Sequence, residues 1–188
     1  MDTVLDRHWT TESFLAWEDR QEGRHEFDGR EVVPITGGSL AHQQIVFNLR
    51  MLLHRLLSGT AFQVAHEMRL RIGARIRCPD VTVFAGPVEQ TVRTLLDAVA
   101  IFEVLSDDTA TIDRVAKLIE YSEVPSLRAY GLLEQSAMAA TLLQREPGGA
   151  WMATAHLGGS LALPGVGVPL PMAEIYQGLV FPGLADAR

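Results

Sequence analysis

The stretch AVAIFEVL, residues 98–105, is apolar at every position except Glu103. A short, nearly continuous apolar run of this kind predicts a central strand that is buried on both faces of a sheet. An unpaired, charged carboxylate in such a strand costs several kcal/mol or more. Glu103 must therefore be protonated, paired with a basic group or bound to a cation.

Two further polar residues flank this strand in the sequence. Asp80 follows Pro79 and precedes the short strand VTVF, residues 81–84. Because proline removes a ladder donor, Pro79 marks the start of that strand and places Asp80 at a strand end. Lys117 lies on the helix predicted over 106–121 and is the only lysine among 16 basic residues. Since lysine, unlike arginine, can release its proton when buried, a single lysine among arginines suggests a chemical need.

Each of these residues also has a purely structural interpretation. Asp80 could cap a turn, and Glu103 could pair with a buried arginine. Lys117 could pair on the helix surface with Asp113, an interaction worth only tenths of a kcal/mol. Their order along the chain favours a catalytic site: an acid at one strand end, an acid on the next strand, and a lysine on the following helix.

The remaining patterns predict an α+β fold in one domain, residues 1–188, without repeats or linkers. Helices are expected over 10–21, 39–57, 106–121 and 172–176. Strands are expected over 62–72, 81–84, 98–105, 129–134, 138–144 and 151–157, together with a hairpin over 25–35 that turns at Asp28-Gly29. The arginine-rich segment GARIR, residues 73–77, is expected to be a turn.

Composition limits the class of protein. Of the 188 residues, 47% are hydrophobic and 21% are charged, which is typical of a globular domain. Cys78 is the single cysteine, so no internal disulfide can form, and we expect a reducing, cytoplasmic location. No signal peptide and no membrane helix of roughly 18 apolar residues is expected. The net charge of −7 argues against a basic nucleic-acid coat protein but is compatible with carboxylates gathered around a metal.

Two further features adjoin the predicted site. The densest basic stretch, Arg69 to Arg77, lies just before Asp80. Its arginines could contact a phosphate backbone, or they could cover a solvated hairpin, and the sequence leaves both interpretations open. His42, near the start of the long helix, could approach the site or could be a capping or surface residue.

Several segments, taken together, resemble a family of restriction endonucleases that is sometimes called "Uma two". The resemblance covers residues 9–181, and its order and spacing are specific. The segments that carry it are RHEFDGREVV (24–33), SLAHQQIVFNL (39–49), RCPDVTVF (77–84), FEVLSDDTATIDRVAKLIEYSEVPSLRAY (102–130) and PLPMAEIYQG (169–178). The family was first filed as a domain of unknown function and is placed in the PD-(D/E)XK nuclease superfamily.

The resemblance implies a restriction-endonuclease-like core, a central mixed β-sheet flanked by helices, and a site for divalent metal. By position, Asp80 and Glu103 would bind the metal, and Glu26 would complete the metal site. Lys117 would be the catalytic lysine, and Tyr121, one helical turn later, would help to place it.

The sequence departs from the family pattern at two points. Position 105, where the superfamily motif has its lysine, is Leu105 in this chain. The segment EFDG, residues 26–29, is one residue shorter than the usual family segment, which could shift Glu26 relative to the following strand.

The resulting expectation is a hydrolase: a Mg²⁺- or Mn²⁺-dependent endonuclease that cleaves phosphodiester bonds of nucleic acid, DNA rather than RNA. A homodimer would provide one active site for each strand of a duplex. The predicted substrate-binding residues are Arg69, Arg71, Arg75, Arg77 and Tyr121. The alternative is a nuclease fold that has lost catalysis and serves in binding or regulation. A serine or cysteine hydrolase is disfavoured, because no G-x-S-x-G motif is present.

Overall fold

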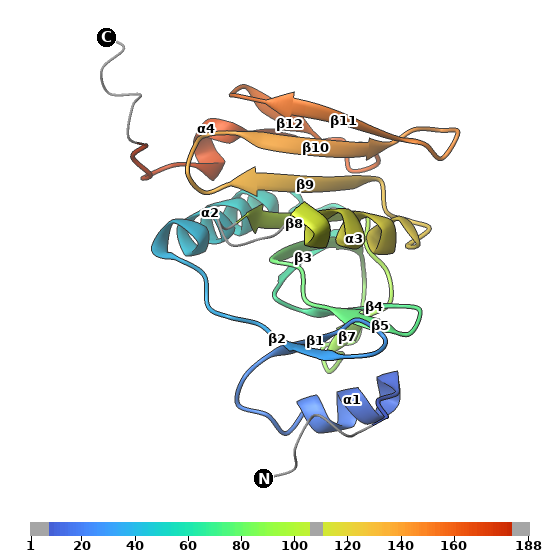
Figure 1. Ribbon diagram of the computed structural model, residues 1–188. Helices are drawn as coiled ribbons and strands as arrows, with labels where there is room; N and C mark the ends of the chain where they lie inside the picture. The colour runs from blue at the N-terminus through green and yellow to red at the C-terminus, as the bar shows by residue number, and fades with distance from the viewer. Residues whose placement is uncertain (1–7, 106–110, 182–188) are drawn as a thin grey trace.

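The computed structural model describes residues 8–105 and 111–181, which form two larger sheets and a small third one, with four helices (Figure 1). The six-stranded sheet has the order β11-β10-β9-β8-β6-β3. Its strands are β3 (Phe62–His66), β6 (Val81–Ala85), β8 (Ala100–Leu105), β9 (Ala129–Glu134), β10 (Ala140–Arg145) and β11 (Trp151–His156).

The five-stranded sheet has the order β2-β1-β5-β4-β7, and the small sheet pairs β12 with β13. The strands of these two sheets are β1 (His25–Phe27), β2 (Val32–Pro34), β4 (Arg69–Ile72), β5 (Arg75–Arg77), β7 (Thr94–Leu95), β12 (Ser160–Ala162) and β13 (Pro169–Pro171). The helices are α1 (Thr11–Glu18), α2 (Leu40–Leu56), α3 (Thr111–Ser122) and α4 (Met172–Ile175).

β8 is the central strand that the apolar run predicted. It pairs antiparallel with β6 and parallel with β9, so the sheet is mixed. All six of its residues are buried. Side chains from α2 and α4 pack in one hydrophobic core with β6, β8 and β9, while Tyr121 on α3 belongs to a second core that also includes Leu70 of the five-stranded sheet. The α+β class is therefore confirmed.

The hairpin and the long helix form as predicted. At the Asp28-Gly29 turn, the Asp28 carboxylate accepts hydrogen bonds from the backbone N–H groups of Arg30 and Glu31, both at 2.7 Å. Ser39 caps α2, because its hydroxyl accepts the backbone N–H of His42. The cap predicted for α3 lies in 106–110, outside the described residues.

Two predictions about strands were wrong. The segment 62–72 is not one strand: the chain breaks at Glu67, whose φ is 49°, and β3 and β4 join different sheets. The segment 73–77 is not only a turn, because Arg75–Arg77 forms β5. The alternation of polar and apolar residues continues there, with Ile76 fully buried and the arginines satisfied by carboxylates, so the density of arginine was misleading.

No described helix is long and apolar enough to cross a membrane.

Candidate active site

The register of two neighbouring strands brings the predicted acids together. In the antiparallel pair β6–β8, Val81 lies opposite Phe102. Asp80 comes just before Val81 and Glu103 just after Phe102, so both acids occur at the same end of the pair. Both line a cavity of about 270 Å³, together with Lys117 from α3 and Glu26 from β1. The structure thus collects the four predicted catalytic residues around one cavity.

A backbone hydrogen bond and a close side-chain contact orient Asp80. The backbone N–H of Val104 donates to Oδ2 of Asp80 at 2.7 Å. The Nε2 atom of His42 lies 3.2 Å from Oδ1 of the same carboxylate. His42 thus reaches the site from the first turn of α2, a contact that the sequence left open. Burial lowers the pKa of His42, although Glu103 and Glu67 oppose this shift.

Helix α3 supplies the partners of Glu103. Lys117 and Tyr121 are one turn apart, so their side chains lie on the same face of the helix. The Tyr121 hydroxyl donates to Oε1 of Glu103 at 2.7 Å, and the Lys117 ammonium nitrogen lies 3.3 Å from the same oxygen. Burial, followed by the charge of Glu103, raises the pKa of Tyr121 well above its usual value, so the phenol stays a donor.

A buried arginine joins this site to the five-stranded sheet. Arg77 forms a bidentate pair with Glu120, at 2.6 and 2.8 Å, and donates to Glu26 at 3.1 Å. The other oxygen of Glu26 accepts the backbone N–H of Cys78 at 2.9 Å and lies 3.9 Å from the Lys117 nitrogen. Glu26 therefore contacts cationic groups on two sides.

Two acids of the cavity, Asp80 and Glu103, are easier to protonate than in water. Burial raises the pKa of Asp80 to about 6, although the Val104 N–H and the charge of Lys117 oppose the shift. Burial also raises the pKa of Glu103 to about 7, where Lys117 opposes the shift and the negative charge of Asp80 adds to it. Two buried carboxylates that repel one another mark a place where a cation would be stabilising.

The donor chemistry fits a hard divalent cation. Mg²⁺ is usually bound by one or two carboxylates, with waters and substrate phosphate as the other ligands. Asp80 and Glu103 provide two such carboxylates beside one cavity. Within residues 8–105 and 111–181, no three His, Cys, Asp or Glu side chains form a ready-made metal cluster. Asp80 and Glu103 are therefore the described residues that could hold such a cation.

The four arginines of the basic stretch are paired with acidic side chains. Arg69 contacts Glu18 and Asp19, each at 2.7 Å. Arg71 contacts Glu12 at 3.1 Å, Arg75 contacts Glu123 at 2.9 Å, and Arg77 lies in the buried pairs described above. Of the four, only Arg77 adjoins the acids of the cavity. A role for these residues in phosphate binding stays a prediction.

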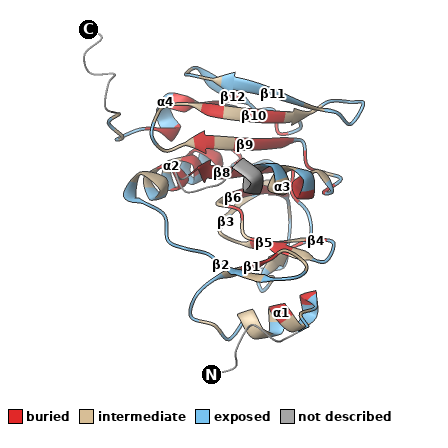
Figure 2. Cartoon of the chain, viewed as in Figure 1, coloured by how far each residue is buried: buried red, intermediate tan, exposed pale blue. Residues whose placement is uncertain are grey.

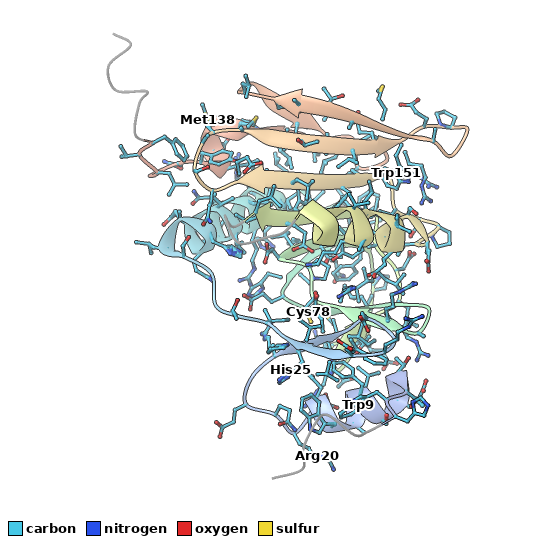
Figure 3. All side chains as sticks on the ribbon, viewed as in Figure 1. Trp9, Arg20, His25, Cys78, Met138 and Trp151 are labelled. Atoms are coloured by element: carbon cyan, nitrogen blue, oxygen red, sulfur yellow. The ribbon has the colours of Figure 1, made fainter. Side chains whose placement is uncertain are left out.

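Cys78 lies between the two larger sheets, near the middle of the molecule (Figure 3). Burial raises the pKa of its thiol to about 12, and the charges of Glu26 and Glu18 add to the shift. Because the thiolate is the nucleophilic form, a thiol of this kind is unreactive at neutral pH. The site therefore contains acids and a lysine, but no activated cysteine.

Sequence reasoning missed Glu120, which is buried and holds Arg77. Nothing in the sequence distinguishes this glutamate from an exposed acid on the helix. The His42 contact also depends on the distant pairing of α2 with the end of β6. The two glycines just before α2, residues 37–38, were the one sequence feature that indicated close packing at the start of this helix.

Comparisons with known proteins agree with this architecture. The fold superposes on a crystal structure described as a "putative nuclease belonging to DUF820" from Anabaena variabilis, with a TM-score of 0.75. The match covers 89% of this chain and 97% of that chain at 13% sequence identity, and it therefore concerns the fold. The chain thus shares the α+β fold of that structure.

The family follows from sequence comparison. A family model described as "Putative restriction endonuclease" matches residues 11–173, and the chain belongs to this family, Uma2. Two relatives come from Synechocystis. "Uncharacterized protein slr1290" is 27% identical over 175 residues, which are 90% of this chain and 92% of the relative. "Uncharacterized protein sll1609" is 28% identical over 155 residues, which are 79% and 88% of the two chains.

Proposed function

We propose that this protein is a metal-dependent endonuclease that hydrolyses phosphodiester bonds in nucleic acid, DNA rather than RNA. The observation that carries the proposal is the meeting of Asp80, Glu103 and Lys117 around one cavity, with Lys117 3.3 Å from Glu103. Membership of a family described as "Putative restriction endonuclease" supports the same reaction class.

Asp80 and Glu103 would hold Mg²⁺ or Mn²⁺. When bound, such a cation stabilises charge on the phosphoryl oxygens and lowers the pKa of an attacking water. The Val104 N–H and His42 keep the Asp80 carboxylate in a fixed orientation. Tyr121 does the same for Glu103. Fixed ligands reduce the reorganisation that the reaction requires.

Lys117 is the basic residue of the proposed site. Its ammonium group lies between Glu103 and Glu26, at 3.3 and 3.9 Å, and borders the cavity. From there it orients a water for attack or neutralises charge on the phosphate in the transition state. Leu105 occupies the usual motif position, so the charge reaches the site from α3 and not from β8.

Glu26 supports Lys117 from the five-stranded sheet. Its carboxylate accepts hydrogen bonds from the Cys78 N–H and the Arg77 guanidinium, and its Oε1 atom lies 3.9 Å from the Lys117 nitrogen. In this proposal Glu26 acts chiefly by placing Lys117, and it would contact a bound metal directly or through water.

The decisive experiment is cleavage of supercoiled plasmid by the purified protein with Mg²⁺ or Mn²⁺. Nicking should require the metal, stop with EDTA and disappear in Asp80→Ala. Glu146→Ala, an exposed acid on the β10–β11 turn, is the matched control and should keep full activity. Equal nicking by Asp80→Ala would contradict the proposal.

A nuclease fold that binds nucleic acid without cleaving it is the second candidate. The observation in its favour is that Glu26 is already engaged by Arg77 and Cys78. Wild-type protein that binds Mn²⁺ in calorimetry but does not cleave supercoiled, linear or single-stranded DNA, or RNA, would favour this candidate.

A homodimer is part of the proposal, because two sites would serve the two strands of a duplex. Strand β11 is an edge of the six-stranded sheet, and four of its six residues are exposed (Figure 2). Met152 on this strand is exposed, as is Leu157 immediately after it. Gel filtration should give twice the mass of one chain, and a monomer mass would contradict the dimer.

A further inference from the structure

The start of α2 brings an imidazole into the proposed site. His42 is the third residue after the Ser39 cap, and its backbone N–H is held by the Ser39 hydroxyl. Its ring lines the cavity shared with Glu103 and Lys117. It also lines an adjoining cavity of about 180 Å³ that runs towards Arg24. The ring thus lies where two cavities meet, with Nε2 at 3.2 Å from Oδ1 of Asp80.

Gly38 has no room for a side chain, because the His42 ring fills the space. A Cβ atom placed on Gly38 would lie 2.1 Å from Nδ1 and 2.6 Å from Cγ of that ring. The backbone of Gly38 does not have a positive φ, so the need for glycine here is steric rather than conformational. The Nδ1 side of the ring therefore packs against Gly38, while Nε2 faces Asp80.

Asp80 depends on these contacts because it precedes β6 and is not part of the strand ladder. Its Oδ2 atom is fixed by the Val104 N–H, which leaves Oδ1 to be fixed from the opposite side. The Nε2 atom of His42 lies 3.2 Å from this Oδ1 atom.

We propose that His42 is a positioning residue, which fixes Oδ1 of Asp80 through Nε2, and that position 38 is glycine to admit its ring. This inference rests on the proposed function for its catalytic meaning. It goes beyond that function in assigning the start of α2 to the site and in predicting a steric requirement at position 38.

A set of variants isolates this contact. His42→Leu removes the donor, while His42→Gln can place an amide N–H near the position of Nε2. Gly38→Ala keeps the histidine but displaces its ring. The double variant Gly38→Ala/His42→Leu has no ring to displace. Gly148→Ala and His54→Leu are controls: Gly148 also lacks a positive φ but has open space around it, and His54 is an exposed histidine on the same helix.

The first readout needs no metal: hydrogen exchange of the Val104 amide, whose N–H donates to Asp80. We expect exchange to accelerate about tenfold in His42→Leu and in Gly38→Ala, because a mobile carboxylate is a poorer acceptor. It should stay near the wild-type rate in His42→Gln and in both controls. The double variant should equal His42→Leu, since two changes that remove one contact are not additive. If His42→Leu does not fold, Gly38→Ala decides the question.

The second readout is calorimetric titration with MnCl₂. Loss of the residue that orients a ligand should weaken Mn²⁺ binding about tenfold or more in His42→Leu, with recovery in His42→Gln. Unchanged Val104 exchange in both His42→Leu and Gly38→Ala would overturn the inference. If the wild-type protein binds no Mn²⁺, the proposed function loses its metal site, while the exchange rates still decide the role of His42.

Discussion

The ammonium nitrogen of Lys117 lies 3.3 Å from Oε1 of Glu103, although the two residues belong to different elements and are 14 positions apart. The superfamily motif would place its lysine two residues after the acid, on the same strand. In this chain that position is Leu105, which is buried. The charge is therefore supplied from α3, and the identity of residue 117 becomes a test of the site.

Replacing Lys117 by arginine should abolish nicking despite the retained charge. The planar guanidinium is larger than an ammonium group and does not release its proton, so it cannot substitute in the space between Glu103 and Glu26. We expect at least about a 100-fold loss of rate in Lys117→Arg and in Lys117→Met. Plasmid nicking under single-turnover conditions measures this loss.

The control for that measurement is Arg20→Lys, an exchange of the same two residue types on the exposed surface next to α1 (Figure 3). It should cleave at the wild-type rate. A Lys117→Arg protein with wild-type activity would show that a basic charge alone is sufficient, and that Lys117 does no specific chemistry.

Neutral amides in place of the two acids should stabilise the metal-free protein at alkaline pH. Burial raises the pKa of Glu103 to about 7 and that of Asp80 to about 6, so the folded state holds protons that the unfolded state has lost. Stability from this source is complete below the unfolded pKa values and falls as pH rises from about 4 to about 7. In Glu103→Gln and Asp80→Asn, the replaced group no longer titrates, so it causes no decrease of stability as the pH rises.

At pH 8 in EDTA, we therefore expect Glu103→Gln to unfold at a higher temperature than the wild type. Its free energy of unfolding should be larger than that of the wild type by a value on the order of 2 kcal/mol. The difference should shrink at pH 4.5. Calorimetric melting at both pH values measures it, with Glu146→Gln as the control. A difference that does not depend on pH would contradict the assigned protonation.

Metal binding should release protons near neutral pH. The ligands must lose their protons to bind a cation, and both carboxylates have raised pKa values. Titration with MnCl₂ at pH 6.5, in buffers of different ionisation enthalpy, should therefore give apparent enthalpies that depend on the buffer. The dependence should diminish at pH 8.5. Asp80→Asn should abolish the binding signal, and a signal of wild-type strength in that variant would place the metal elsewhere.

Removing Arg77 should destabilise the fold strongly. Arg77→Leu would leave Glu26 and Glu120 buried without their shared cation, a loss of about 3–5 kcal/mol for a broken buried pair. Arg71→Leu is the matched control, because Arg71 is more exposed and its surface ion pair with Glu12 contributes little to stability. Urea unfolding compares the two variants, and equal stabilities would contradict the structural role of Arg77.

The sequence was most informative where a local pattern decides the outcome. The apolar run of β8 marked a buried strand, and Asp28-Gly29 marked a hairpin, because both depend on neighbouring residues. The break at Glu67 could not be predicted, since the alternation resumes after it with Leu70 and gives no sign that the strand has changed sheets.

The candidate site was partly predictable for the same reason. Asp80 stands out as an acid at a strand end, Glu103 as an acid inside a buried strand, and Lys117 as a single lysine. The partners that hold them do not stand out. Arg77 and Glu120 are 43 positions apart, and their pairing depends on how a strand of one sheet meets α3. That long-range arrangement is a property of the folded chain, and no local pattern records it.

The backbone at Glu67 has a mechanical consequence. Its N–H contacts the carbonyl oxygens of both Pro79 and Asp80, at 3.1 and 3.2 Å. Glu67, where the chain passes from β3 in one sheet to β4 in the other, is therefore hydrogen-bonded to the backbone of Asp80. Any sliding of the sheets past one another would displace Asp80 relative to Glu26, which comes from the opposite sheet. The width of the cavity is thus set by the separation of two sheets, so a ligand that forced the sheets apart would also separate the charged groups.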